Sequence, residues 1–203
     1  MSEPQSRALV WVPIVHTEAD LGSMTDAVRR RIDRSDGPAG WDERQRAITA
    51  MWEALRAAVA GLGLDPRTVR LYQDGLPVCD REAQIVRDLA QAGSPNHVIL
   101  RDWMDRGATL TGTESPALVL EEYEVAQQLL RDEAADPALV AHSRDVLARR
   151  DVFIAGRIAA TLRPGETGLL FLGLLHSLEG MLPADIIVTR LRYLAPLPSP
   201  QLG

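Results

Sequence analysis

The segment GLLFLGLLH, residues 168–176, is almost entirely apolar and ends in a histidine. A continuous apolar run of this length is typical of a strand that is covered on both faces, as in a parallel sheet. A similar run, RALVWVPIV at residues 7–15, comes directly before His16. The two runs therefore predict two core strands, each with an imidazole at its carboxyl end.

Helical and strand patterns alternate in the rest of the chain. Residues 42–60 have the three- and four-residue apolar spacing of an amphipathic helix, and TVRLYQDG, residues 68–75, is typical of a strand that ends in a turn. Further helices are predicted over residues 80–93, 98–104, 118–130 and 136–162, and the last could break at Ser143 or Gly156. Extended segments are predicted over residues 108–115 and 185–194. Residues 17–40 are predicted to form a loop or a short helix. We therefore expect an α/β fold: a single domain over residues 1–195, with a central, mostly parallel or mixed sheet flanked by helices, and a disordered tail over 196–203.

The composition excludes several classes of function. The chain has 203 residues and a formal net charge of -6, and all its basic residues are arginine. Nucleic acid is not an expected partner because no basic stripe occurs, and the lack of lysine excludes Schiff-base chemistry. Cys79 is the only cysteine, which excludes an internal disulfide and favours a reducing, cytoplasmic location. No membrane span or secretion leader is expected, and the chain could be a monomer or a homodimer.

Each predicted strand places its histidine where ligands gather in such sheets, beyond the carboxyl ends of the strands. His16 is followed by Glu18, and His176 by Glu179. An imidazole with a carboxylate close behind it can hold a divalent metal, or can act as a general base with its orienting acid. A lone histidine at such a position is more often a hydrogen-bonded structural residue, so the second histidine is what favours a shared site. The remaining two, His97 and His142, are interpreted as surface or capping residues.

Two further glutamates are candidates for this site. GTESPALVLEEYE, residues 112–124, contains Glu114, which could bind a metal, and Glu121, which could lie on the inner face of a helix as a catalytic carboxylate. The alternative is that Glu114 only starts the helix and that the later glutamates form a solvated face. The sequence leaves both interpretations open.

Polar residues elsewhere could bind the substrate. Gln73 and Asp74 end the second predicted strand, although Asp-Gly is also a strong turn signal. Arg150 and Arg157 are seven residues apart and share a helix face, so they could reach an anionic group, or could pair with nearby aspartates. Cys79 precedes a predicted helix, where a thiol is more often inert than nucleophilic.

Four segments together, IVHTEADLGS, LVLEEYE, RRDVFIAGRI and LLFLGLLHSLEG, resemble the TraB/Tiki and erythromycin esterase-like (ChaN-like) superfamily. Residues 173–176, Gly-Leu-Leu-His, match its late Gly-x-x-His motif, His16 is similar to its early histidine, and residues 150–157 look like its arginine helix. Residues 13–16, Pro-Ile-Val-His, depart from the glycine-containing approach usual there, and the chain is shorter than most members. The resemblance implies an α/β fold and hydrolysis, although the superfamily also includes haem-linked and non-hydrolytic proteins.

Two functions follow as expectations. The first is a metal-dependent hydrolase that acts on an ester or amide of a small molecule or peptide. Its expected catalytic residues are His16, His176, Glu18 and Glu121, and its expected ligands for a divalent metal ion are His16, His176 and Glu114. The second is a regulatory module that binds a small ligand or haem in the same two-histidine pocket without turnover. A purely structural partner protein would instead show a large exposed apolar face.

Overall fold

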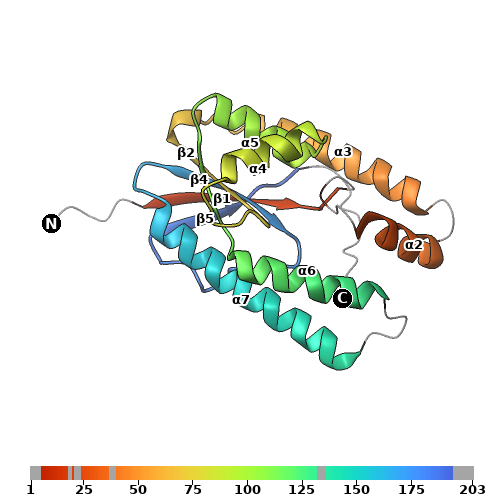
Figure 1. Ribbon diagram of the computed structural model, residues 1–203. Coiled ribbons are helices and arrows are strands. Elements are labelled where there is room, and N and C mark those ends of the chain that lie inside the picture. The colour runs from red at the N-terminus through yellow and green to blue at the C-terminus, as the bar shows by residue number, and fades with distance from the viewer. Residues whose placement is uncertain (1–5, 18–19, 21–23, 37–39, 132–135, 194–203) are drawn as a thin grey trace.

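A five-stranded, entirely parallel sheet forms the centre of the computed structural model (Figure 1). The structure describes residues 6–17, 20, 24–36, 40–131 and 136–193, so the expected tail lies outside the described residues. The strand order is β3-β2-β4-β1-β5. The strands are β1 (Arg7–Ile14), β2 (Val69–Gln73), β3 (Thr109–Thr111), β4 (Thr167–Gly173) and β5 (Ile186–Arg190). The predicted α/β class with a central sheet is confirmed, in its parallel form.

Helices cover both faces of this sheet (Figure 1). On one face lie α3 (Gly40–Ala60), α4 (Glu82–Gln91) and α5 (Pro95–Asp105), and on the other lie α7 (Pro137–Thr161) and its neighbour α6 (Pro116–Arg131). A sixth helix, α2 (Thr25–Asp36), packs against α3, and a short 3-10 turn, η2 (Pro66–Thr68), precedes β2. Within the described ranges, no helix combines the length and the apolar character needed to cross a bilayer.

The continuous apolar runs are explained by burial on two sides. Along β4, Leu169 and Phe171 pack into the cluster beneath α3, α4 and α5, whereas Leu170 and Leu172 pack into the cluster beneath α7. All four side chains are fully buried, and burial of each contributes about 1.5–3 kcal/mol. Successive residues of a strand point to opposite faces, so a strand between two helical layers needs apolar residues at every position.

The structure differs from the expected elements at several boundaries. Residues 17–40 contain α2, which is one of the two structures expected there, whereas α7 runs through Ser143 and Gly156 without the expected break. Helix α4 begins at Glu82, two residues later than expected, and its capping residue, Arg81, makes no side-chain cap bond. By contrast, α5 begins earlier than expected because the Ser94 side chain accepts the His97 backbone N–H and caps its first turn.

Candidate functional site

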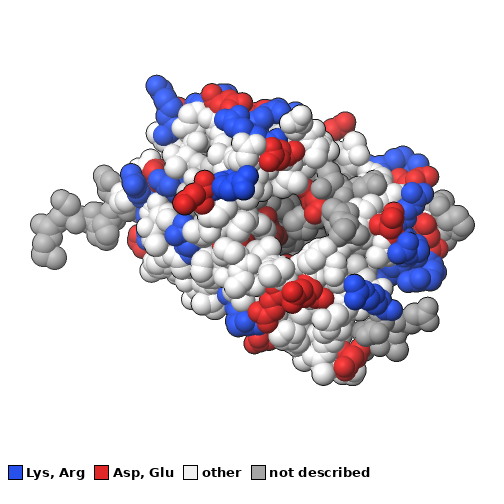
Figure 2. Space-filling model, viewed as in Figure 1, with Lys and Arg blue, Asp and Glu red and all other residues white. Residues whose placement is uncertain are grey.

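Four polar side chains follow four strands of the sheet. His16 lies two residues beyond β1, Asp74 directly follows β2, and Glu114 and His176 each lie three residues beyond the ends of β3 and β4. Because all strands are parallel, these residues lie at one edge of the sheet. Figure 2 shows a hollow between the helices on the two faces of the sheet, with acidic atoms visible inside it.

Asp74 is the centre of this group. Its Oδ1 accepts a hydrogen bond from the Arg150 guanidinium at 2.7 Å and lies 3.5 Å from His176 Nε2. Its Oδ2 accepts the Gly173 backbone N–H at 2.9 Å and lies 3.5 Å from His16 Nε2. One buried carboxylate is therefore flanked by the two imidazoles that the sequence singles out.

The position of Asp74 requires a glycine at residue 173. A Cβ atom on Gly173 would stand 2.7 Å from Asp74 Oδ2, which is closer than real Cβ contacts. The glycine therefore lets the carboxylate approach the backbone of β4 and accept its N–H. This gives the Gly-Leu-Leu-His segment a physical role: its first residue receives Asp74 and its last residue, His176, faces the same carboxylate.

His176 is a buried imidazole bound on both sides. Its Nδ1 lies 2.6 Å from Asp151 Oδ1, and the other Asp151 oxygen accepts the Ser177 backbone N–H at 3.0 Å. Burial lowers the pKa of His176, but the hydrogen bonds to Asp151 and Asp74 outweigh it and raise the pKa to about 10. At neutral pH the ring is therefore an imidazolium whose two N–H groups face carboxylates. The ring thus holds Asp74 in place from the side of β4.

His16 is the imidazole that solvent can reach, because 45% of its side chain is exposed whereas 4% of that of His176 is. The protein groups packed around His16 lower its pKa by desolvation, and the hydrogen bond and charge of Asp74 outweigh this, so the pKa is raised above 6.5. A substrate or water molecule entering the site from solvent would therefore meet His16 before His176.

Arg150 neutralises the carboxylates around it. Its guanidinium binds Glu114 at 2.6 and 3.2 Å, Asp74 at 2.7 Å and Glu122 at 2.5 Å. Burial lowers the pKa of Arg150, but the charges of Asp74 and Glu114 outweigh it and raise the pKa above its usual value. Burial raises the pKa of Glu114, which Arg150 only partly offsets. Arg150 thus lies in the site with its guanidinium bound to three carboxylates of the chain.

Asp74, Glu114 and His176 could hold a metal ion, since each offers one ligand atom and these atoms all lie within 4.8 Å of one another. Two carboxylates and an imidazole are suitable ligands for several divalent metals. However, one Arg150 nitrogen already binds Asp74 and Glu114, at 2.7 and 2.6 Å, so an ion would have to displace it. His16 is not part of this group, because Asp74 lies between the two rings; the predicted ligand set of His16, His176 and Glu114 is corrected accordingly.

Two other predicted residues, Glu121 and Arg157, do not join the site. Glu121 binds Arg149 at 2.6 Å and lies 3.3 Å from His142, and it is the next residue of α6, Glu122, that reaches Arg150. Arg157 donates to the carbonyl of Gly112, directly after β3, at 3.1 Å, and not to a carboxylate of the site. Glu18 lies outside the described residues.

Gln73 lies beside the group, on the opposite side of β2 from Asp74. Its Nε2 donates to the Asp74 carbonyl at 2.9 Å, and its buried Oε1 has no partner among the residues that the structure describes. A buried acceptor without a donor costs free energy unless water or a ligand supplies one. Gln73 is thus placed where the sequence suggested, with one acceptor left for a further molecule.

A second buried network fixes the segment after His16. The Asp20 carboxylate accepts the Thr17 N–H and hydroxyl at 2.8 Å each, and accepts the Ser94 hydroxyl at 2.6 Å. Ser94 Oγ in turn lies 2.7 Å from His97 Nδ1. His97 is therefore buried in the first turn of α5, whereas the sequence suggested a surface or capping residue. Burial raises the pKa of Asp20, but its hydrogen bonds to His97, Ser94 and Thr17 outweigh this and hold the pKa well below its usual value.

Serine, histidine and aspartate are the residue types of a nucleophilic triad, but this network cannot serve as one. Ser94 is completely buried, and its hydroxyl already donates to Asp20. A nucleophile must reach the substrate. The network instead joins the start of α5 to the residues that follow His16. Ser94 was not singled out from sequence, although the helix-start pattern Ser-Pro at 94–95 could have indicated it.

No known family model, curated protein or solved structure matches this chain. What the site can do is therefore argued from its geometry. A half-exposed imidazole faces an ionised carboxylate that a guanidinium, a backbone N–H and a second imidazole hold in place. Such a pair can accept a proton from water and return it to a leaving group.

Proposed function

We propose that this chain is a hydrolase of esters or amides of small molecules, with His16 as general base and Asp74 as the carboxylate that orients it. The observation that carries the proposal is the position of Asp74 between the two rings, 3.5 Å from each. In other hydrolases a buried carboxylate beside an imidazole sets the orientation of the ring and stabilises its protonated form. The raised pKa of His16 agrees with such a partner.

The proposed reaction needs one water molecule and no covalent enzyme intermediate. His16 takes a proton from the water molecule while the water oxygen forms a bond to the carbonyl carbon of the substrate. The product of this step is a tetrahedral oxyanion. When the bond to the leaving oxygen or nitrogen breaks, the proton on His16 passes to the leaving group. Positioned acid–base groups of this kind contribute about 10²–10⁴-fold to rate.

The remaining residues of the site would act through Asp74. Arg150, Gly173 and His176 together bind both of its oxygens, so the carboxylate cannot turn away from His16. The two imidazoles also keep Asp74 ionised: burial raises the pKa of Asp74, and its hydrogen bonds to His16 and His176 lower it well below the usual value. The resemblance of residues 173–176 to the TraB/Tiki and erythromycin esterase-like superfamily supports the same assignment.

A metal-dependent hydrolase is the second candidate, because Asp74, Glu114 and His176 could hold a metal ion. When bound, a divalent cation would supply Lewis acidity to a carbonyl oxygen or lower the pKa of a water molecule. The two candidates differ in the role of Arg150. In the first, its guanidinium is the permanent cation of the site, whereas in the second it must give up its bonds to Asp74 and Glu114.

A hydrolysis screen with matched histidine variants tests the proposal. Initial rates of the purified chain would be measured on acetyl, butyryl and benzoyl esters and anilides. We expect His16→Ala to lower kcat about 10²–10⁴-fold, and His142→Ala to leave it unchanged, because His142 lies at the surface beside Glu121. Equal rates for both variants and the native chain would defeat the assignment of His16.

Metal analysis separates the two candidates. The preferred one expects full activity after dialysis against a chelator, and it expects Arg150→Met to gain affinity for Zn²⁺ or Mn²⁺ in calorimetric titrations, since two buried carboxylates then lose their cation. Stoichiometric metal in the native chain, together with loss of activity on chelation and recovery on reloading, would establish the metal-dependent candidate instead.

A further inference from the structure

A cavity of about 790 Å³ opens beside the site, between α3 and the turn that joins α4 to α5. Thr17, the residue directly after His16, lines it, as do Gly93 and Pro95 of that turn. Cavities of roughly 300–1,000 Å³ are typical of small-molecule sites. The cavity is therefore of a size to hold a small molecule, and its lining residue Thr17 directly follows the proposed general base, His16, in the chain.

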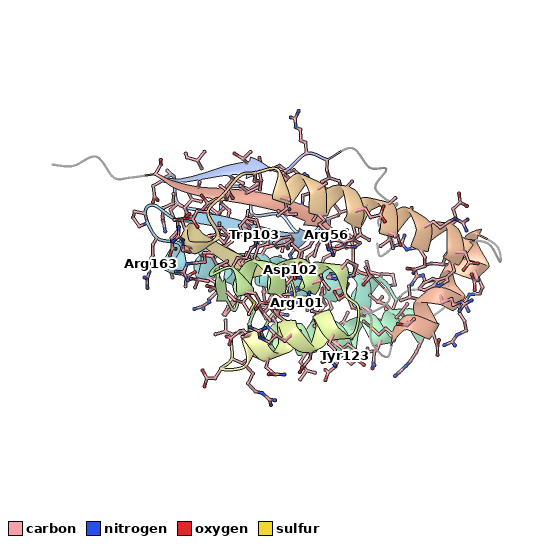
Figure 3. All side chains as sticks on the ribbon, turned by 90° about the horizontal axis from the view of Figure 1, so that it is seen from above. Arg56, Arg101, Asp102, Trp103, Tyr123 and Arg163 are labelled. Atoms are coloured by element: carbon pink, nitrogen blue, oxygen red, sulfur yellow. The ribbon has the colours of Figure 1, made fainter. Side chains whose placement is uncertain are left out.

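The cavity has an apolar floor and a rim of mixed charge. Ile48 and Trp52 of α3 line it, and only 3% of each residue is exposed. Glu53 and Arg56, of the same helix, are exposed lining residues of opposite charge. Figure 3 shows Arg56 between α3 and α5. A rim with one charge of each sign gives no net attraction to an anion or a cation, which favours an uncharged ligand with an apolar body.

Trp52 also provides an unused hydrogen-bond donor. Its indole Nε1 is buried and has no acceptor among the described residues. A buried N–H without an acceptor is uncommon in folded proteins and destabilises the fold until water or a ligand satisfies it. A ligand that carries a carbonyl or ether oxygen on its apolar body could supply that acceptor.

The wall between the cavity and His16 is rigidly connected. Thr17 donates twice to Asp20, and Asp20 accepts the hydroxyl of Ser94, which precedes the lining residue Pro95. All three members of this connection are largely buried. The position of His16 is therefore tied to the wall of the cavity, so a molecule that fills the cavity would have a fixed position relative to the imidazole.

We propose that this cavity binds the non-reacting part of the substrate, and that the substrate is an uncharged ester or amide with an apolar body and an oxygen acceptor for Trp52. The inference rests on the proposed hydrolase function and adds the substrate class to it. Binding energy at the cavity would hold the carbonyl group beside His16, which lowers the entropy lost in reaching the transition state.

Selectivity between a large and a small ester tests the inference. 1-Naphthyl acetate and methyl acetate share the acetyl group that reacts, and they differ in the part that would fill the cavity. We expect the native chain to hydrolyse the naphthyl ester with the higher kcat/KM, beyond the ratio of the two spontaneous hydrolysis rates. Thr49→Trp places a large ring in the cavity from an exposed lining position. It should lower kcat/KM at least tenfold for the naphthyl ester and less than twofold for methyl acetate.

Two tryptophan variants provide a matched pair. Trp52→Phe removes the unused donor and should raise KM for the naphthyl ester about 2- to 10-fold, the effect of one hydrogen bond, with kcat unchanged. Trp103→Phe is the control, because Trp103 belongs to the same apolar cluster and is as well buried, but does not line the cavity. An equal change in KM in both variants would overturn the assignment of the cavity.

The outcomes distinguish this inference from the function on which it rests. If the native chain hydrolyses both esters and Thr49→Trp alters neither, the cavity is not the substrate site, although the hydrolase function stands. If neither ester is hydrolysed, the proposed function fails, and calorimetric titration with 1-naphthylacetamide then decides on the cavity alone. Binding to the native chain that Thr49→Trp abolishes supports a binding site there, and no binding overturns it.

Discussion

Replacing Asp74 by asparagine removes the charge at the centre of the site while it keeps the shape of the side chain. Asp74 is 4% exposed and accepts hydrogen bonds from Arg150 at 2.7 Å and from the Gly173 N–H at 2.9 Å. Removing one partner of a buried ion pair lowers the free energy of unfolding by about 3–5 kcal/mol. We expect about 3 kcal/mol here, because Arg150 keeps its bonds to Glu114 and Glu122. The stability of the folded state should fall by that amount at pH 7.

Urea unfolding, followed by circular dichroism, measures this change from the shift in midpoint at constant slope. Asp65→Asn is the matched control: Asp65 pairs with Arg67 at 2.9 Å on the exposed surface, so its loss should leave the midpoint unchanged. If Asp74→Asn and Asp65→Asn unfold at the same urea concentration as the native chain, Asp74 is not the buried centre of a charge network, and the reasoning for the site is refuted.

Two further predictions concern the neighbours of Asp74. The pKa of His176 is raised to about 10 in the folded chain, so its contribution to stability is complete below pH 6.5 and is lost as the pH rises toward 10. The free energy of unfolding should therefore fall between pH 6 and 10, and it should fall less in Asp151→Asn. Parallel curves of unfolding free energy against pH for the native chain and this variant would contradict the role of Asp151. Gly173→Ala should displace Asp74 and lower both stability and any hydrolytic activity, because its Cβ would stand 2.7 Å from a carboxylate oxygen. Gly156→Ala, in α7 with open space at its Cβ, should instead stabilise the chain by about 0.5–1 kcal/mol; equal melting temperatures for the two variants would contradict the close packing at Gly173.

Much of the fold could be predicted from the sequence because parallel strands buried on two faces leave a clear pattern. Residues 7–15 and 168–176 contain uninterrupted apolar runs, and they form β1 and β4, the neighbours at the centre of the sheet. The meeting of His16, Asp74 and His176 followed from the same pattern, since parallel strands bring their carboxyl ends to one edge. The sequence pattern of β3 was less clear, because a strand of three residues is too short to show the alternation of apolar and polar side chains.

The partners of the charged residues could not be predicted, because they depend on helix rotation and on contacts distant in sequence. Successive residues of a helix point about 100° apart, and the sequence does not reveal which of Glu121 and Glu122 faces Arg150; the structure selects Glu122. His97 has the local sequence of a surface turn, yet it is buried. Asp20, 77 positions earlier in the chain, joins its network through Ser94.

The most direct test of the central claim is the pKa of His16, measured by NMR titration of its ring proton and assigned with the His16→Ala variant. The pairing with Asp74 raises this pKa in the native chain. We expect a value above 6.5 that falls in Asp74→Asn, because the hydrogen bond and the negative charge that favour the protonated ring are then lost. An identical His16 titration in both proteins would contradict the acid–base pair on which the proposed function depends.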